Sequence, residues 1–405
     1  MKLAFVDNLA VGGGISRFSY LLCESLVAYS EEMQIDYYVH YENLKRTPEL
    51  HHMGARVKII PLESTRPISL IKRITGRLAK KLSVKGNPGD ALKKEIESKV
   101  IGYDIAYFPS AHMMERPNLQ VAVVGTLHDF NWKYFFGQSI FPLSFVKMMD
   151  AEIMKWMQGY NVCSSHDVVN EAKKLYPSAV RYPAVVPIAP VVMHKVVTEE
   201  KALSIMRSLN IDFPYIIFPG NFYPHKNHLN LFTAFSLLRK RPGFENYKLI
   251  LTGMNSEQVP YGIAEYRGVQ LLTSVSSNTF YDIRGMGYQS NEVIDVLIQK
   301  AKLLVSPSIY EAICTPAMDA WNFGTPTAIS DIPPFREHET AWGVTSAFFD
   351  PMDAQDMAAV IENCIVNYNE TAASGLLSKK KMAEYTWQKV AAGYMEVFKK
   401  ALDNK

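Results

Sequence analysis

Residues 303–331 of this 405-residue chain read LLVSPSIYEAICTPAMDAWNFGTPTAISD, and this stretch decides the fold. The apolar run Leu303–Val305 is typical of a short buried strand. A helix that begins near Thr315–Pro316 suits the sequence, because proline in the first turn lacks an N–H that would have no partner there. The pattern therefore predicts a strand, a loop that holds Glu311, and a helix that holds Asp319.

The two acidic residues of this stretch could serve a bound diphosphate. Free N–H groups at the start of a helix form a site for an anion, and Glu311 and Asp319 stand eight residues apart around that start. One carboxylate could hold a sugar hydroxyl and the other a ribose hydroxyl. The spacing alone leaves a second interpretation open, in which Glu311 caps the helix and Asp319 is an exposed helix residue.

Strand-like and helix-like segments alternate on both sides of this stretch. Strands are predicted in the first half at Leu3–Val6, Ile35–Val39, Val57–Ile60, Ile105–Phe108 and Val121–Val124. In the second half they are predicted at Tyr215–Phe218, Leu249–Leu251 and Leu303–Val305. Helical periodicity appears between strands at Ser16–Ala28, Phe145–Met157, Leu229–Arg239 and Asn291–Ala301. The alternation predicts an α/β fold with parallel sheets covered by helices on both faces.

The length of the chain and the restart of this pattern after Met193 predict two domains, because 405 residues exceed one ordinary core. We place an N-terminal domain at residues 1–190 and a C-terminal domain at residues 191–385. The last segment, residues 386–405, predicts a helix with apolar side chains at Val390, Tyr394, Val397 and Leu402. That helix could pack on either domain.

Composition and charge exclude several classes of protein. The chain has 48% apolar and 20% charged residues, as soluble globular proteins do, and no apolar run reaches the roughly 18–20 residues that span a bilayer. A net charge of +3 is too small to indicate nucleic acid as a partner. The four cysteines lack C-x-x-C spacing, so neither zinc nor a disulfide framework is indicated. The N-terminus reaches Asp7 too early for a signal peptide, and we expect a cytoplasmic protein.

One segment of the first half is strongly basic. No acidic residue lies between Glu63 and Asp90, and basic side chains there are Arg66, Lys72, Arg73, Arg77, Lys80, Lys81 and Lys85. Apolar residues interleave with them. A basic amphipathic helix can lie on anionic lipid headgroups, so residues 66–85 could contact the inner face of the membrane peripherally. The other interpretation is a solvated helix face.

A second candidate motif, FPGNFYPHKNH at residues 218–228, follows the predicted strand Tyr215–Phe218. A lysine at the end of such a loop can reach a phosphate leaving group as a point charge. Lys226 is therefore a candidate for phosphate binding. The alternative is an ordinary lysine on a surface loop.

Two further motifs lie in the first half. Residues 12–17, GGGISR, follow the first strand, but Arg17 occupies the place of the third glycine of a dinucleotide-binding fingerprint, which disfavours an NAD oxidoreductase. Residues 126–129, TLHD, follow the strand Val121–Val124. A histidine there faces the crevice in which α/β proteins bind ligands. His128 is thus a candidate ligand contact, although a lone histidine can also be purely structural.

Together these motifs resemble those of retaining GT-B glycosyltransferases, and in particular glycosyltransferase family 4. Residues 306–331 resemble the E-x7-E region of that family, with Asp319 in place of the second glutamate and Cys314 in place of a usual glycine. Residues 218–228 resemble its G-R-x-x-x-x-K-N motif, with Asn221 in place of the arginine. The glycine loop resembles G-G-x-x-R-[FY], and TLHD resembles [TV]-x-H-D. Residues 285–288 and 293–302 resemble the segment that brackets the nucleotide base.

The resemblance implies a GT-B architecture, in which two Rossmann-like domains with parallel sheets face a deep interdomain cleft. The catalytic residues that it implies are His128, Lys226 and Glu311. The donor-binding residues that it implies are Gly13, Gly14, Arg17, Asn221, Gly287, Tyr288, Thr315, Pro316 and Asp319. It implies no metal site and no cofactor.

The implied reaction is transfer of a mannose-, glucose- or rhamnose-type hexose, with retention, from a GDP-, UDP- or dTDP-linked sugar. The implied acceptor is a glycan or a lipid-linked oligosaccharide in the synthesis of cell-surface polysaccharide. A nucleotide-sugar epimerase and a phosphorylase share the fold, but the E-x7-D segment disfavours the first, and the lack of a pyridoxal-phosphate lysine motif disfavours the second. The departures at Asn221, Cys314 and Asp319 leave open a non-catalytic GT-B scaffold in a polysaccharide assembly complex.

Overall fold

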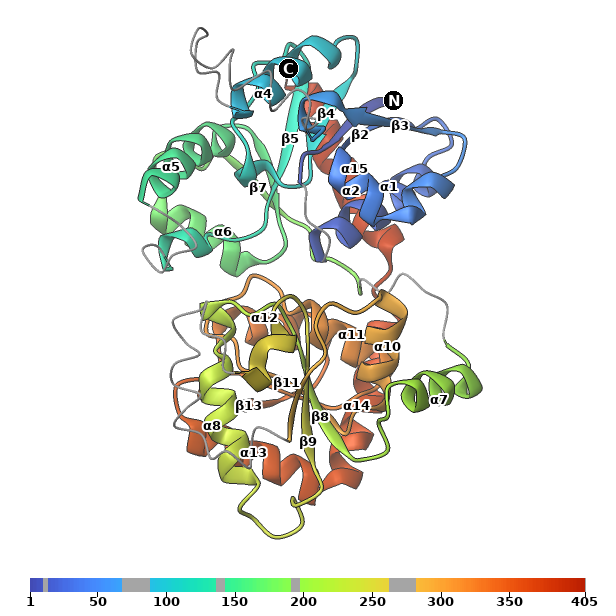
Figure 1. Ribbon diagram of the computed structural model, residues 1–405. Coiled ribbons are helices and arrows are strands. Elements are labelled where there is room, and N and C mark those ends of the chain that lie inside the picture. Colours follow the sequence, from blue (N-terminus) through green and yellow to red (C-terminus); the bar gives the residue numbers. More distant parts are fainter. Residues whose placement is uncertain (10–13, 68–87, 136–142, 191–196, 262–281, 405) are drawn as a thin grey trace, which may run out of the picture. The chain divides into compact units, whose positions relative to one another are not determined.

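The computed structural model of the chain describes residues 1–9, 14–67, 88–135, 143–190, 197–261 and 282–404. It contains two compact units. The first comprises Met1–His128, Leu143–Ile188 and Trp387–Lys405, and the second comprises Asp129–Pro142 and Ala189–Thr386. Each unit is built on its own parallel sheet with helices on both faces, as the alternating sequence pattern predicts (Figure 1).

The sheet of the first unit has the strand order β3-β2-β1-β4-β5-β6-β7. Its strands are β1 (Lys2–Asp7), β2 (Gln34–His40), β3 (Val57–Leu62), β4 (Ile105–Phe108), β5 (Ala122–Leu127), β6 (Tyr160–Cys163) and β7 (Tyr182–Val185). All neighbouring strands pair in parallel. The direction of strand order reverses between β1 and β4, and ligands of α/β proteins bind outside the carboxyl ends of strands at such a point.

The helices of the first unit are α1 (Gly14–Tyr29), α2 (Tyr41–Arg46), α4 (Pro88–Lys99), α5 (Leu143–Met157), α6 (His166–Leu175) and α15 (Trp387–Asp403). Helix α15, the last of the chain, packs beside α1 and against β5 (Figure 1). Its Tyr394 is 1% exposed, and the Tyr394 hydroxyl lies 2.9 Å from Thr126 Oγ1. The final helix is therefore part of the core of the first unit.

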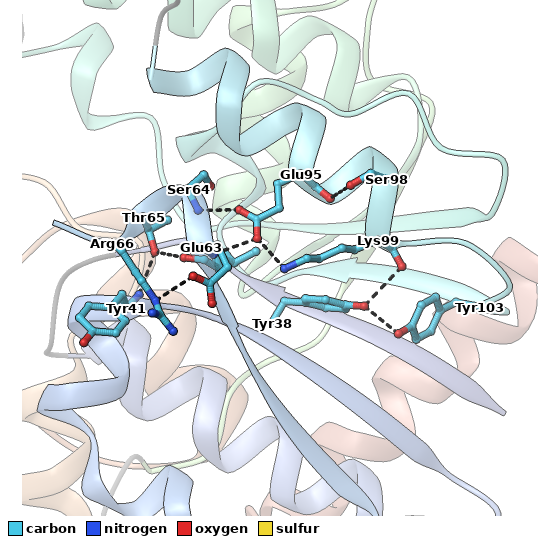
Figure 2. Close-up of polar contacts among 11 residues, drawn as sticks. Tyr38, Tyr41, Glu63, Ser64, Thr65, Arg66, Glu95, Ser98, Lys99 and Tyr103 are labelled. Atoms are coloured by element: carbon cyan, nitrogen blue, oxygen red, sulfur yellow. Dashed lines mark hydrogen bonds and ion pairs between the residues drawn. The ribbon is translucent and has the colours of Figure 1, made fainter. Parts of the chain in front are cut away.

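Helix α4 is fastened to the turn after β3 by one carboxylate, that of Glu95 (Figure 2). It accepts hydrogen bonds of 2.8 Å from the backbone N–H groups of Glu63 and Ser64, and a bond of 2.6 Å from Lys99 Nζ. The hydroxyl of Tyr38 on β2 donates to the carbonyl of Lys99 at the end of the same helix. In the sequence, the predicted basic segment, residues 66–85, comes between these two elements, and its residues 68–85 are outside the described part of the chain.

The second unit has the strand order β10-β9-β8-β11-β12-β13, again parallel throughout. Its strands are β8 (Tyr215–Pro219), β9 (Lys248–Thr252), β10 (Ile283–Gly285), β11 (Leu303–Ser306), β12 (Thr327–Ser330) and β13 (Ala347–Phe349). Here the order reverses between β8 and β11. These are the strands that precede the two motifs predicted to bind the donor.

The helices of the second unit are α7 (Glu199–Ser208), α8 (His228–Leu238), α10 (Asn291–Lys300), α11 (Thr315–Phe323), α12 (Pro333–Trp342), α13 (Ala354–Val366) and α14 (Tyr368–Met382). Helices α8 and α13 pack together on one face of the sheet, whereas α10, α11 and α14 cover the other (Figure 1). The core beneath α8 contains Phe218, Phe232 and Phe235, all at most 1% exposed. Burying each such ring contributes about 1.5–3 kcal/mol, so the strand end before the Lys226 loop is firmly held.

No helix in the part of the chain that the structure describes is both long enough and apolar enough to cross a bilayer.

Candidate active site

The candidate site lies where β8 and β11 end side by side in the second sheet. The loop after β8 carries Lys226, and the loop after β11 carries Glu311. Parallel strands present their carboxyl ends at one edge of a sheet, and the strand order reverses between β8 and β11, a place where α/β proteins bind ligands. The topology thus brings together two motifs that lie far apart in the sequence.

Backbone and side-chain hydrogen bonds join the two loops. The Ile309 N–H donates to the carbonyl of His225 at 2.9 Å, and Asn227 Nδ2 donates to the carbonyl of Pro307 at 3.0 Å. Asn227 also donates to the carbonyl of Pro351 at 2.7 Å. Its backbone has φ 55°, a left-handed conformation that asparagine tolerates. The two loops therefore form one connected layer at the edge of the sheet.

Within this layer, Lys226 and Glu311 form an ion pair, and their side chains are only 19% and 11% exposed. Burial by itself lowers the pKa of Lys226, but the carboxylate of Glu311 outweighs it and raises that pKa above the ordinary value. The carboxylate of Asp129 acts in the same direction. Lys226 is therefore a firmly protonated cation, as phosphate binding requires.

Helix α11 begins beside this ion pair, as predicted, with Thr315 first and Pro316 in its first turn. Its N-cap residue is Cys314, whose side chain makes no capping hydrogen bond. The Cys314 thiol instead donates to Ser306 Oγ at 3.3 Å, and burial raises its pKa to about 12. The thiol is thus neutral and puts no negative charge at the start of α11, where an anion could bind.

Asp319 lies on the buried side of α11 and is 1% exposed. The interpretation of Asp319 as an exposed helix residue is therefore wrong. The interpretation of Glu311 as the helix cap is also wrong, because the cap is Cys314 and Glu311 pairs with Lys226. The predicted contact of Asp319 with a ribose stays a prediction.

Asn221 holds a neighbouring loop in place. Its Oδ1 accepts a hydrogen bond of 2.9 Å from the N–H of Met254, which follows β9. At Gly253, with φ 111°, an added Cβ would lie 2.5 Å from the carbonyl oxygen of Gly220, so the two loops approach too closely for any other residue. Where the family has a cationic arginine, this chain thus has an amide that fixes the loop after β9.

Gly287 and Tyr288 follow β10 at the same edge of the sheet. The N–H of Gly287 donates to Ser256 Oγ at 2.9 Å, and its carbonyl accepts from the N–H of Gly253 at 2.9 Å. Tyr288 is 67% exposed. The residues predicted to bracket the base are therefore held to the loop that Asn221 also contacts.

In the first unit, His128 directly follows β5. Its Nε2–H donates to the carbonyl of Pro109 at 2.7 Å. Its ring makes T-shaped contacts with the rings of Phe18 and His112, with centroids 5.3 and 5.8 Å apart. Burial lowers the pKa of His112 to about 4, so this second histidine is neutral. His112 was not predicted from the sequence, although it follows β4 as His128 follows β5.

Of the other predicted residues in this unit, Gly14 and Arg17 lie in the first turn of α1, and Gly13 lies outside the described residues. Across the part of the chain that the structure describes, histidine, cysteine, aspartate and glutamate side chains form no group of three that could hold a metal ion.

The chain is similar in sequence to known glycosyltransferases. Residues 204–380 match the model of the family described as "Glycosyl transferases group 1". Over 191 residues the chain is 26% identical to the O-antigen chain mannosyltransferase B of Escherichia coli, and over 114 residues it is 28% identical to the MMP alpha-(1->4)-mannosyltransferase of Mycolicibacterium hassiacum. These matches cover 46% and 28% of this chain, and less than half of either relative, 45% and 28%.

Solved structures match the whole chain. The sucrose-phosphate synthase of Thermosynechococcus elongatus has a TM-score of 0.72 at 14% identity, with all of both chains covered. HepE of Anabaena, in complex with UDP and glucose, has a TM-score of 0.69 at 14% identity, covering 99% of this chain and 100% of HepE. The chain thus has the GT-B fold, and its residues 204–380 match the group 1 glycosyltransferase family.

Proposed function

We propose that the protein is a retaining glycosyltransferase that transfers a hexose from a nucleotide-diphosphate sugar to a glycan or lipid-linked acceptor. The observation that carries the proposal is the Lys226–Glu311 pair beside the start of α11, at the reversal of strand order between β8 and β11. A protonated lysine and the start of a helix at one point suit a diphosphate. The carboxylate next to them suits the hydroxyls of a sugar.

The chemistry that we propose is chiefly electrostatic. Transfer with retention generates positive charge at the anomeric carbon and negative charge on the departing diphosphate. Lys226 and the first amides of α11 stabilise the leaving group in a partly buried setting, where such interactions are strongest. The departing phosphate then takes the proton of the acceptor hydroxyl, so no separate base is needed.

The remaining predicted residues have supporting roles in this proposal. Gly287, Tyr288 and Asp319 bind the nucleoside, and the glycine loop with Arg17 binds near the donor phosphates. His128 orients the donor sugar, and we expect His128→Ala to lower kcat more than it weakens nucleotide binding.

The curated relatives guide the choice of donor and acceptor. Both are named mannosyltransferases, one of them acting on O-antigen chains, and a solved structure similar in fold holds UDP and glucose. We therefore propose a hexose of mannose or glucose type, with rhamnose as a third candidate, and an acceptor in cell-surface polysaccharide synthesis.

A thermal-shift panel with UDP, GDP, dTDP and ADP, each with and without magnesium, tests the donor site. A ligand that binds only the folded protein raises Tm, so one nucleotide should raise it selectively. Lys226→Ala should abolish that rise, whereas Lys240→Ala, which removes an exposed lysine at the end of α8, should retain it.

Transfer is then measured with the hexose donors of the nucleotide that binds, and the anomeric configuration of the product tests retention. A nucleotide that binds without any transfer would favour the non-catalytic scaffold. If no nucleotide raises Tm, the proposed donor site is wrong.

A further inference from the structure

A short aromatic segment, Asp129–Phe135, leaves the end of β5 and belongs to the second unit. Asp129 accepts a hydrogen bond of 3.0 Å from the N–H of Asn131, and a single 3-10 turn follows at Asn131–Lys133. Phe130 and Trp132 are 0% and 1% exposed, with their rings 5.6 Å apart. Phe130, Trp132 and Phe135 are therefore buried, whereas Tyr134 is 47% exposed.

Tyr310, the residue before Glu311, is the attachment point of this segment. The Phe130 N–H donates to the Tyr310 hydroxyl at 2.9 Å. The Tyr310 ring also lies 5.2 Å from that of Tyr134 and 6.0 Å from that of Phe135. Tyr310 thus uses both its hydroxyl and its ring, and the two are separable by mutation.

The same segment also reaches the Lys226 loop. The ring of Phe135 lies 5.5 Å from that of His225, whose carbonyl accepts the N–H of Ile309. Asp129 contributes to the raised pKa of Lys226. One element therefore contacts both loops of the candidate site, at the residues that immediately precede Lys226 and Glu311.

We infer that Tyr310 is a positioning residue, which holds Glu311 and the Lys226 loop in register by fixing them to the segment Asp129–Phe135. The inference rests on the proposed function for its kinetic consequence, but not for its structural one. Rings that pack and a hydroxyl that bonds to backbone restrict the loop more than either contact alone. Because Glu311 follows Tyr310 directly in the sequence, restricting the loop at Tyr310 also restricts the position of the Glu311 carboxylate.

Two variants separate the contributions. Tyr310→Phe keeps the ring and removes the hydroxyl, whereas Tyr310→Ala removes both. Tyr385→Phe is the matched control, because its hydroxyl bonds to a backbone group elsewhere in the same unit, the carbonyl of Ala341, at 2.9 Å.

Hydrogen exchange followed by mass spectrometry gives a readout that needs no activity. We expect faster exchange in residues 129–135 for Tyr310→Phe, and in residues 129–135 and 307–314 for Tyr310→Ala, because the Phe130 and Ile309 amides lose protection. Tyr385→Phe should leave both regions unchanged. Unchanged exchange in both Tyr310 variants would overturn the inference, even if they lost activity.

Kinetics distinguish positioning from general stability. We expect kcat to fall about tenfold in Tyr310→Phe and about a hundredfold in Tyr310→Ala, with KM for the donor nearly unchanged, because misplaced groups cost rate more than binding. Activity lost only in proportion to the folded fraction would contradict a positioning role. A wild-type protein without transfer activity would refute the proposed function, and the exchange measurement would still decide the role of Tyr310.

Discussion

Lys226 and Glu311 form an ion pair although 85 residues separate them in the chain. Both side chains are mostly buried, so the pair is poorly screened by solvent. Any anion that binds Lys226 must therefore compete with a carboxylate that already occupies its ammonium group. Because of this competition, substitutions of Lys226 and of Glu311 should have different effects on nucleotide binding.

Glu311→Gln should bind a nucleoside diphosphate more tightly than the wild type while losing transfer activity. Removing the carboxylate releases the Lys226 ammonium for phosphate, and we expect the Kd to fall about tenfold. Calorimetry with the nucleotide found in the thermal-shift panel measures this change. Glu200→Gln, in the exposed first turn of α7, is the control. Weaker binding by Glu311→Gln would show that the carboxylate does not compete.

Lys226→Ala should destabilise the fold, and adding Glu311→Gln should restore part of the loss. Removing only the cation leaves the Glu311 carboxylate mostly buried without its partner, at a cost of about 3 kcal/mol. Chemical denaturation of both single variants and the double variant gives the coupling between the residues. Strictly additive losses would mean that the pair contributes nothing to stability.

Asp7→Asn should change how stability depends on pH. Asp7 at the end of β1 is buried and accepts hydrogen bonds from Tyr37 and Asn43, and burial raises its pKa to about 6 from 3.8. The folded state therefore binds this proton more tightly than the unfolded state does. The stability that Asp7 contributes is fully present below pH 3.8 and is lost as the pH rises through about 6.

The free energy of unfolding of Asp7→Asn, relative to that of the wild type, should therefore increase by about 2–3 kcal/mol between pH 4 and pH 7. Denaturation curves across that range measure it, with the exposed Asp212→Asn as control. A constant difference between Asp7→Asn and wild type would show that Asp7 does not titrate in this range.

Glu95→Gln should weaken the first unit near neutral pH but not in acid. Burial raises the pKa of Glu95, but hydrogen bonds from Lys99, Ser64 and Glu63 outweigh it and lower the pKa below 4.5. The stability that this carboxylate contributes is therefore present above pH 4.5 and lost as pH falls further.

We expect the free energy of unfolding of Glu95→Gln to be about 1 kcal/mol below that of the wild type at pH 7. The value is modest because solvent screens part of the interaction. The difference should shrink to zero near pH 3. Denaturation at both values, with Glu31→Gln as an exposed control, measures it, and a loss independent of pH would point to packing instead of charge.

Most of the fold could be predicted from the sequence, because buried strands of parallel sheets read as short apolar runs. Every strand listed from those runs is present. Strand β7 was not predicted, since Pro183 interrupts it, and proline is tolerated there only because β7 lies at the edge of the sheet. Strands β6, β10, β12 and β13, each of three or four residues, were not predicted either.

The candidate site was less predictable. The motifs identify Lys226 and Glu311, but no local signal tells that the two side chains meet, because the contact depends on the neighbouring positions of β8 and β11. The aromatic residues after His128 look like any apolar stretch. Only the folded chain shows that Phe130 and Phe135 belong with Tyr310 and His225.

The position of helix α15 has a consequence for synthesis of the chain. Tyr394 contacts Tyr107 and Thr126, and Trp387 lies 5.9 Å from Phe18, so the core of the first unit is closed by residues that follow the second unit in the chain. The ribosome delivers the entire second unit before the first can complete its interior. A nascent chain therefore carries an open, apolar N-terminal half until α15 has been made, and that interval is when chaperones have the most to bind.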